Sequence, residues 1–211
     1  IEDHMTATFH GSNTVATIND LGLPPAADLS ALHLIDATTL LFTLKSAAQL
    51  GPVSAHAGDI LRWEDGIITL EIPATVLGLG PATGIDALFI NGDSLVFSVD
   101  IASVVNGLAV TDSDLLSWTP AGGVALWIGQ DVCGIPHEND LTGAHLLADG
   151  DLLLAFASAS QVGGTTLRKG DIARCDPSDG SVVTHRRFSD LGPQWAAIAI
   201  DAVSQFVLEQ I

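Results

Sequence analysis

Short apolar stretches, rather than long amphipathic ones, run through the whole chain. Apolar residues recur at every second position or in runs of four to six, such as 124–128 and 152–157, and no useful length of chain repeats them at helical spacing. This pattern predicts short β-strands. Asn-Gly or Asp-Gly pairs, which are typical of tight β-hairpins, occur at 65–66, 91–92, 149–150 and 179–180. The sequence therefore predicts an all-β protein.

The predicted strands belong to a sequence repeat. Three segments align with one another, and they cover residues 29–45, 85–100 and 141–157. A small residue marks equivalent positions at Ala31, Ala87 and Gly143, which are 56 residues apart. A fourth copy begins at 195–211, and 5–22 matches the second half of the third repeat. The chain therefore holds three complete repeats and a fourth that is divided between its two ends.

Each repeat predicts four strands, which in the second repeat cover 85–90, 95–100, 114–119 and 123–129. Four antiparallel strands in a unit of about 55 residues describe one blade of a β-propeller. We therefore expect a four-bladed β-propeller whose last blade is closed by the N- and C-terminal segments, which leaves no free edge strand. A β-sandwich is the main alternative, but it explains neither the regular period nor the matching ends.

The repeat predicts a single domain over residues 5–211. We expect residues 1–4 to be a cloning remnant, because His4 directly precedes Met5, the only methionine. The segment that follows Met5 has neither the basic nor the apolar region of a signal peptide. A secreted or cell-surface domain is often produced without its signal, and we favour that location.

The second repeat, IDALFINGDSLVFSVD at 85–100, resembles the hemopexin repeat, in which an Asp-Ala pair opens the inner strand. It is also similar to blade-like repeats of large bacterial surface proteins. Only this repeat keeps the pair, as Asp86 and Ala87; the others have Ser30-Ala31, Thr142-Gly143 and Ala196-Ala197. The resemblance implies a four-bladed disc with a narrow axial channel that holds ions on backbone carbonyls.

Composition limits the kinds of partner. The 211 residues include 25 Asp and Glu but only 7 Lys and Arg, a formal net charge of −18. Such a surface repels the phosphates of nucleic acids and the headgroups of anionic membranes, so we expect neither as a partner. No apolar run reaches the roughly 18 residues of a membrane-spanning helix. Cations, basic proteins and neutral small molecules remain.

The long connections between predicted strands are expected on one face of the disc, and they include 46–58, 101–113 and 158–170. Loops on a rigid scaffold commonly carry binding residues, so we expect a small molecule or a protein ligand on this face. Its only cations are Lys45, Arg168 and Lys169, which suit either an anionic ligand or ordinary surface ion pairs.

The predicted mouth of the channel combines Ser30, Asp86, Thr142 and Ala196, the matching positions of the inner strands. One carboxylate with neighbouring oxygens suits Ca²⁺ or Na⁺, and a water-filled channel is the alternative. Trp195 lies beside this mouth in the predicted fold and is a candidate stacking platform for a ligand.

His33 and His145 occupy the same inner-strand position in the first and third repeats, where the second has Phe89. Opposite blades of a fourfold ring face each other, so two imidazoles there could bind a transition metal. Packing of both rings between blades is the alternative, and Phe89 at the equivalent position favours it.

Loop 130–140, QDVCGIPHEND, has the densest group of polar side chains. Cys133 and His137 are spaced to form a thiolate–imidazolium pair or to bind a metal, with Glu138 or Asp140 orienting the histidine. His137 is the candidate general base. A solvated polar loop is the alternative, and the two cysteines, Cys133 and Cys175, fit either one disulfide or two thiols.

Asp59, Asp114 and Asp171 recur once per repeat, where a strand begins. They suit a ring of carboxylates for cations, but recurrence in every repeat favours side chains that accept backbone N–H groups in turns. The sequence as a whole predicts an acidic, non-catalytic binding or scaffold module with a cation in its channel. The alternative is an enzyme that acts on a neutral small molecule around residues 130–140.

Overall fold

Three similar antiparallel sheets form the part of the protein that the computed structural model describes, which comprises residues 23–24, 27–36, 38–187 and 190. Sheet I contains β1 (Leu29–Asp36), β2 (Thr39–Leu44), β5 (Ile60–Glu64) and β6 (Ile67–Ile72). Sheet II contains β7 (Ile85–Asn91), β8 (Ser94–Val99), β11 (Leu115–Thr119) and β12 (Gly123–Ile128). Sheet III contains β13 (Leu141–Leu146), β14 (Leu152–Phe156), β17 (Asp171–Asp176) and β18 (Ser181–Arg187).

The observed strands of sheet II agree with the predicted strands to within one residue at each end, which confirms the all-β prediction and the four-strand unit. The predicted turns are present as well. In the β5–β6 hairpin, Asp65 and Gly66 have φ values of 50° and 85°. Positive φ at both central residues is the requirement of the type I′ turn that Asp-Gly pairs favour.

The long connections are more ordered than the sequence indicated, because each contains a two-stranded hairpin. These hairpins are β3 (Ala48–Leu50) with β4 (Val53–Ala55), β9 (Ser103–Val105) with β10 (Leu108–Val110), and β15 (Ser160–Val162) with β16 (Thr165–Leu167). The repeat unit therefore consists of a four-stranded sheet with a small hairpin inserted between its second and third strands.

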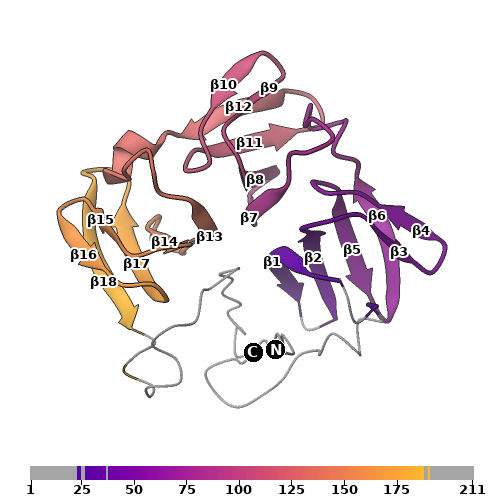
Figure 1. Ribbon diagram of the computed structural model, residues 1–211, viewed down its shortest axis with the longest axis horizontal. Helices are drawn as coiled ribbons and strands as arrows, with labels where there is room; N and C mark the ends of the chain where they lie inside the picture. The colour runs from indigo at the N-terminus through magenta and orange to yellow at the C-terminus, as the bar shows by residue number, and fades with distance from the viewer. Residues whose placement is uncertain (1–22, 25–26, 37, 188–189, 191–211) are drawn as a thin grey trace.

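The three sheets spread outward around a common centre (Figure 1), with β1, β7 and β13 innermost and β6, β12 and β18 at the periphery. Their apolar faces pack against each other. One core cluster joins Leu41 and Ile60 of sheet I to Phe97 of sheet II, and another joins Phe89 of sheet II to Leu154 of sheet III. The hydrophobic effect thus holds successive sheets face to face.

The fourth predicted blade, built from 195–211 and 5–22, lies outside the described residues. Within the described part of the chain, no helix has the length and apolar character needed to cross a bilayer.

Candidate functional site

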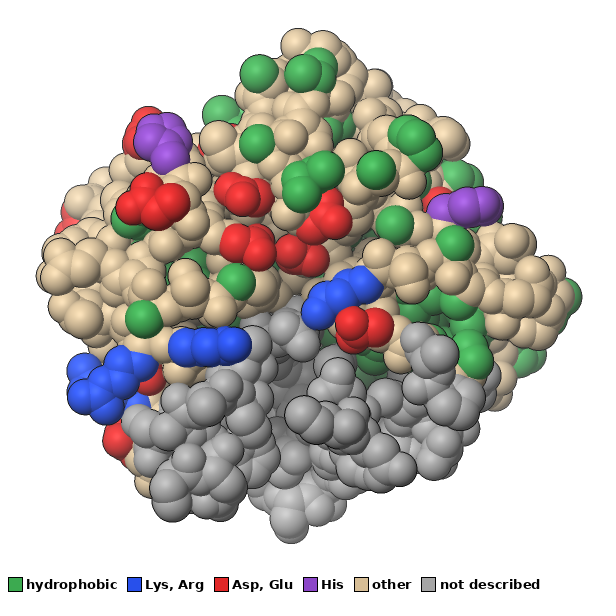
Figure 2. Space-filling view, in the orientation of Figure 1, with side chains coloured by type: hydrophobic (Ala, Val, Ile, Leu, Met, Phe, Trp, Pro, Cys, Tyr) green, Lys and Arg blue, Asp and Glu red, His purple; other side chains and the backbone are tan. Residues whose placement is uncertain are grey.

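The first residues of the three inner strands surround a hollow, which has two adjoining lobes of ≈ 260 and ≈ 240 Å³. Both lobes are lined by Ser30, Lys45, Asp86 and Asp140, the first also by Gly84 and Asp100, and the second also by Thr142, Ala157 and Lys169. Figure 2 shows acidic side chains gathered at the middle of one face, with basic side chains on either side of them. The structure therefore brings together Ser30, Asp86 and Thr142 of the predicted channel mouth. Trp195 and Ala196 lie outside the described residues.

A β-bulge positions each of these three side chains. Strand pairing shifts register between Leu29 and Ala31 in β1, and equivalent shifts occur in β7 and β13. Ser30, Asp86 and Thr142 are the extra residues of these bulges. A bulge changes the direction of a side chain within a strand, so the same irregularity in all three repeats directs three polar side chains into one hollow.

A second set of equivalent positions completes the lining. The residue that precedes each inner strand accepts a hydrogen bond from the backbone N–H of the residue that follows the second strand. The pairs are Asp28 with Lys45 at 2.9 Å, Gly84 with Asp100 at 3.2 Å, and Asp140 with Ala157 at 3.0 Å. The repeat thus places Asp140 at the hollow, in phase with Asp28 and Gly84, and separates it from the loop to which the sequence assigned it.

The Asp86 side chain lies within hydrogen-bonding reach of the Asp140 carboxyl group, and we refer to the two residues as the carboxyl pair. The pKa of Asp140 is raised to about 6, mainly by burial and then by the negative charges of Asp112 and Asp100, while hydrogen bonding to Asp86 and the charge of Lys45 oppose the rise. The Oδ1 atom of Asp140 is buried and has no hydrogen-bond partner. The hollow therefore contains a carboxyl group, that of Asp140, which holds its proton in mildly acidic solution, and one buried oxygen of this group has no donor.

Other polar groups of the mouth are already engaged. The Ser30 hydroxyl lies 2.8 Å from the Thr43 hydroxyl, which donates to the Ile85 carbonyl at 3.0 Å. The Asp100 Oδ1 atom accepts the backbone N–H of Gly84 at 2.7 Å. The bond from Thr43 to Ile85 links the first two repeats, and the other two bonds lie within one repeat each; together they fix the walls of the hollow.

Two lysines add positive charge to the lining. The Lys45 Nζ atom lies 3.6 Å from the Asp28 carboxylate, and both side chains are about half exposed, so the pair contributes little stability. Lys169 belongs to the exposed turn before β17, and its side chain forms no ion pair with the described residues.

The histidine pair predicted at the centre is also brought together. The ring centroids of His33 and His145 are 6.1 Å apart, and the His145 ring meets Phe89 edge-on at 6.2 Å. Burial, with a smaller effect of His145, lowers the pKa of His33 to about 4, and burial lowers that of His145. The Nδ1 atom of each ring is buried without a hydrogen-bond partner. The imidazole rings of His33 and His145 therefore pack against each other as neutral groups.

Metal binding by Asp86, His33 and His145 stays a prediction. In the described part of the chain, no three His, Cys, Asp or Glu side chains are grouped closely enough to hold an ion. The two rings are nearly parallel, with an angle of 28° between their planes.

Loop 130–140 does not assemble the predicted catalytic group. Cys133 forms a disulfide with Cys175 and is buried, so the expected thiolate is wrong. The His137 ring is exposed and is hydrogen-bonded to the Gln130 side chain rather than to Glu138 or Asp140. Glu138 is exposed as well. Of the four residues proposed for catalysis, only Asp140 lines the hollow.

The recurring aspartates have the structural role that their recurrence favoured. Asp114 accepts the backbone N–H groups of Thr111 at 2.8 Å and Gln130 at 3.0 Å. Asp59 makes the same pair of bonds in sheet I, and Asp171 accepts the backbone N–H of Arg168 at 3.0 Å. These carboxylates therefore fix turns at the beginning of the third strand of each sheet.

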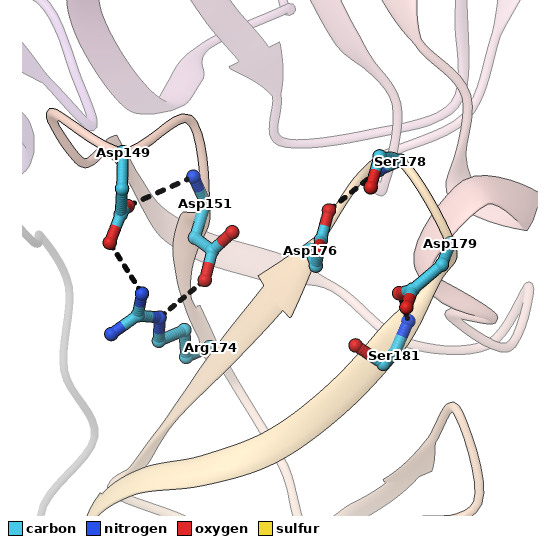
Figure 3. Close-up of polar contacts among 7 residues, drawn as sticks. All are labelled: Asp149, Asp151, Arg174, Asp176, Ser178, Asp179 and Ser181. Atoms are coloured by element: carbon cyan, nitrogen blue, oxygen red, sulfur yellow. Dashed lines mark hydrogen bonds and ion pairs between the residues drawn. The ribbon is translucent and has the colours of Figure 1, made fainter.

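The polar contacts of sheet III in Figure 3 are made by residues that do not line the hollow. Arg174 donates to Asp149 and Asp151, each at 2.5 Å, and Asp176 and Asp179 accept backbone N–H groups within the β17–β18 turn. Arg174 is thus neutralised within its own sheet and is not available to a ligand in the hollow.

Comparisons with known proteins give distant structural likenesses. No family model matches the chain, and no curated protein matches it. The extracellular domain of BT4673 from B. thetaiotaomicron aligns with 83% of the chain at 13% identity and a TM-score of 0.37, and the chain covers 17% of that structure. A Bacteroides caccae protein of unknown function aligns with 76% of it at 10% identity and a TM-score of 0.38, and the chain covers 61% of that structure. Because both TM-scores are below 0.5, we argue function from the residues of this chain alone.

Proposed function

We propose that the protein is a four-bladed, hemopexin-like β-propeller that acts as a non-catalytic binding module, with its ligand site at the axial hollow. The three observed sheets share one strand order and the same bulge in the inner strand, which supports a fourth equivalent unit. The sequence match between 5–22 and the third repeat supplies the missing strand. Closure by the two ends would make 5–211 one domain.

Hydrogen exchange tests the closure of the ring. Backbone amides within 5–22 should exchange as slowly as those of sheets I to III, because strand pairing protects amides. A variant that lacks 195–211 should lose this protection. Fast exchange of 5–22 in the full chain would contradict a blade built from both ends.

The observation that supports a binding role is the hollow itself, where bulges direct Ser30, Asp86 and Thr142 to the place occupied by Asp140. We propose that a cation, with Ca²⁺ and Na⁺ as the inorganic candidates, is held there mainly by Asp86 and Asp140. Oxygen ligands and negative charge suit these ions. Because a bound cation competes with the proton of the carboxyl pair, its affinity should increase as the pH rises through about 6.

Thermal unfolding with and without each ion tests this proposal. Ca²⁺ or Na⁺ should raise Tm in the unmodified protein, because a ligand that binds only the native state stabilises it. Asp86→Asn should abolish the increase, whereas Asp93→Asn, which changes an exposed aspartate in the β7–β8 turn, should leave it intact. Equal Tm values with and without Ca²⁺, Na⁺, Mg²⁺ and Zn²⁺ would contradict binding of an inorganic cation.

An enzyme centred on loop 130–140 has less support. Its proposed thiol is consumed in a disulfide, and the side chains of His137 and Glu138 are exposed and apart from the hollow. The disulfide instead favours the secreted or cell-surface location that we proposed from the sequence. Disulfides persist in oxidising compartments and are rare in the cytosol.

A further inference from the structure

The lining of the axial hollow carries opposite charges. Asp86 and Asp140 line both lobes, and Lys169 lines the second lobe only. Lys45 also lines both lobes, and its charge opposes the rise in the pKa of Asp140. The second lobe therefore combines two carboxyl groups with two lysines.

Two polar groups of the lining, one carboxylate oxygen of Asp140 and the ammonium group of Lys169, have no partner among the described residues. The buried Oδ1 atom of Asp140 has no hydrogen-bond donor, which is costly for a carboxyl group, and Asp140 lines both lobes of the hollow. The Lys169 ammonium has three donors and forms no ion pair with the described residues. A bare metal ion would match the carboxyl groups but would leave Lys169 without a counter-charge.

From these observations we infer that the hollow binds a small zwitterion, with the ammonium group of the ligand on Asp86 and Asp140 and its carboxylate on Lys169. This inference rests on the proposed ligand site and replaces an inorganic cation by an organic one. Lobes of ≈ 260 and ≈ 240 Å³ are smaller than pockets for drug-sized molecules, which start at about 300 Å³. They suit a molecule of the size of an amino acid.

Isothermal titration calorimetry with matched probes tests the inference. The probes are the zwitterions glycine, 3-aminopropanoate, 4-aminobutanoate and 6-aminohexanoate, together with butylamine, butanoate and CaCl₂, all at pH 7.5. At least one zwitterion should bind. Butylamine and butanoate should each bind at least tenfold more weakly than the zwitterion of highest affinity.

Two variants separate the two ends of the site. Lys169→Gln should lower the affinity for the zwitterion at least tenfold and leave the affinity for butylamine unchanged. Asp140→Asn should lower the affinity for both ligands. Arg168→Gln is the matched control, because Arg168 is the neighbouring exposed cation and does not line the hollow. Arg168→Gln should change the affinity for each probe by less than twofold relative to the unmodified protein. The Tm of each variant without ligand shows whether it is folded.

The outcomes distinguish this inference from the inorganic-cation proposal. Binding of CaCl₂ without any zwitterion would overturn the zwitterion site and keep the cation site. Binding of a zwitterion that is insensitive to Lys169→Gln, or no stronger than binding of butylamine, would also overturn it. Absence of binding by every probe would overturn both.

Discussion

At the scale of single residues, the ring position shared by His33, Phe89 and His145 shows how a polar side chain adapts to an apolar position. Both histidine rings are buried against each other and remain neutral, because charging them would require the loss of water without a compensating anion. Phe89 occupies the equivalent position in the second repeat, packs against His145 and has no ionisable group. The free-energy cost of burying the two histidine rings therefore depends on pH.

Acid should destabilise the protein through His33. Its pKa in the folded state is about 4 against a usual 6.5, so between these values the unfolded chain binds a proton that the folded chain does not. Stability is unaffected above pH 6.5 and decreases as the pH falls. Between pH 7.5 and 4.5 the native protein should lose about 2 to 3 kcal/mol more than His33→Phe, measured by urea unfolding.

The comparison of variants isolates this effect, because Asp140, with its raised pKa, changes stability in the opposite direction over the same range. His185→Gln, which replaces an exposed histidine, should follow the native protein. Parallel pH profiles for the native protein and His33→Phe would show that His33 is not a buried neutral group.

At the scale of elements, the turn before the third strand is fixed by one carboxylate in each sheet. Asp114→Ala should lower the free energy of unfolding by about 2 to 4 kcal/mol, because the N–H groups of Thr111 and Gln130 would lose their acceptor. Asp93→Ala, at an exposed turn position, should change it by less than about 0.5 kcal/mol. A urea titration of both variants measures the difference, and similar curves would refute the structural role.

The disulfide fixes the connection between sheets II and III. Cys133 follows β12 in a short 3₁₀ helix (Gln130–Cys133), and Cys175 lies in β17, 42 residues later. Replacing both by alanine should lower stability by about 2 to 5 kcal/mol, because the unfolded chain loses a constraint. Thermal unfolding with and without a reductant measures the same effect in the native chain. No change of Tm on reduction would exclude a stabilising role.

The repeat made the elements predictable, whereas several features of the site depended on contacts that no pattern shows. Equivalent apolar runs predicted the strands of sheet II, because its inner strands β7 and β8 are buried along most of their length. The three-residue strands of the inserted hairpins, such as Ala48–Leu50, are too short to give a periodic signal. The bulge at Ser30 is a matter of register between two strands, which the sequence of one strand does not reveal.

The choice of site residues shows the same limit. Repeat spacing would have assigned Asp140 to the mouth with Asp28 and Gly84, but the dense polar loop before it suggested a different grouping. Two cysteines in one chain are compatible with a disulfide or with two thiols, and only their approach in space decides between them.

At the scale of the whole molecule, the main feature is the negative net charge, since the chain has 25 acidic residues and 7 basic ones. Repulsion among them opposes compaction, and dissolved salt screens it. Raising the salt concentration from 0.01 to 0.5 M should therefore raise Tm by a few degrees, since about 1 kcal/mol corresponds to roughly 2 to 4 °C in a chain of this size.

Comparing different cations separates general screening by salt from binding of a cation at the hollow. Screening depends on ionic strength, so NaCl and tetramethylammonium chloride should stabilise Asp86→Asn equally. In the native protein, any cation that occupies the hollow should add a further increase that saturates with concentration and disappears in Asp86→Asn, as mass action requires. If the two salts gave the same curve in both proteins, the acidic surface would account for the whole response and the hollow would not bind Na⁺.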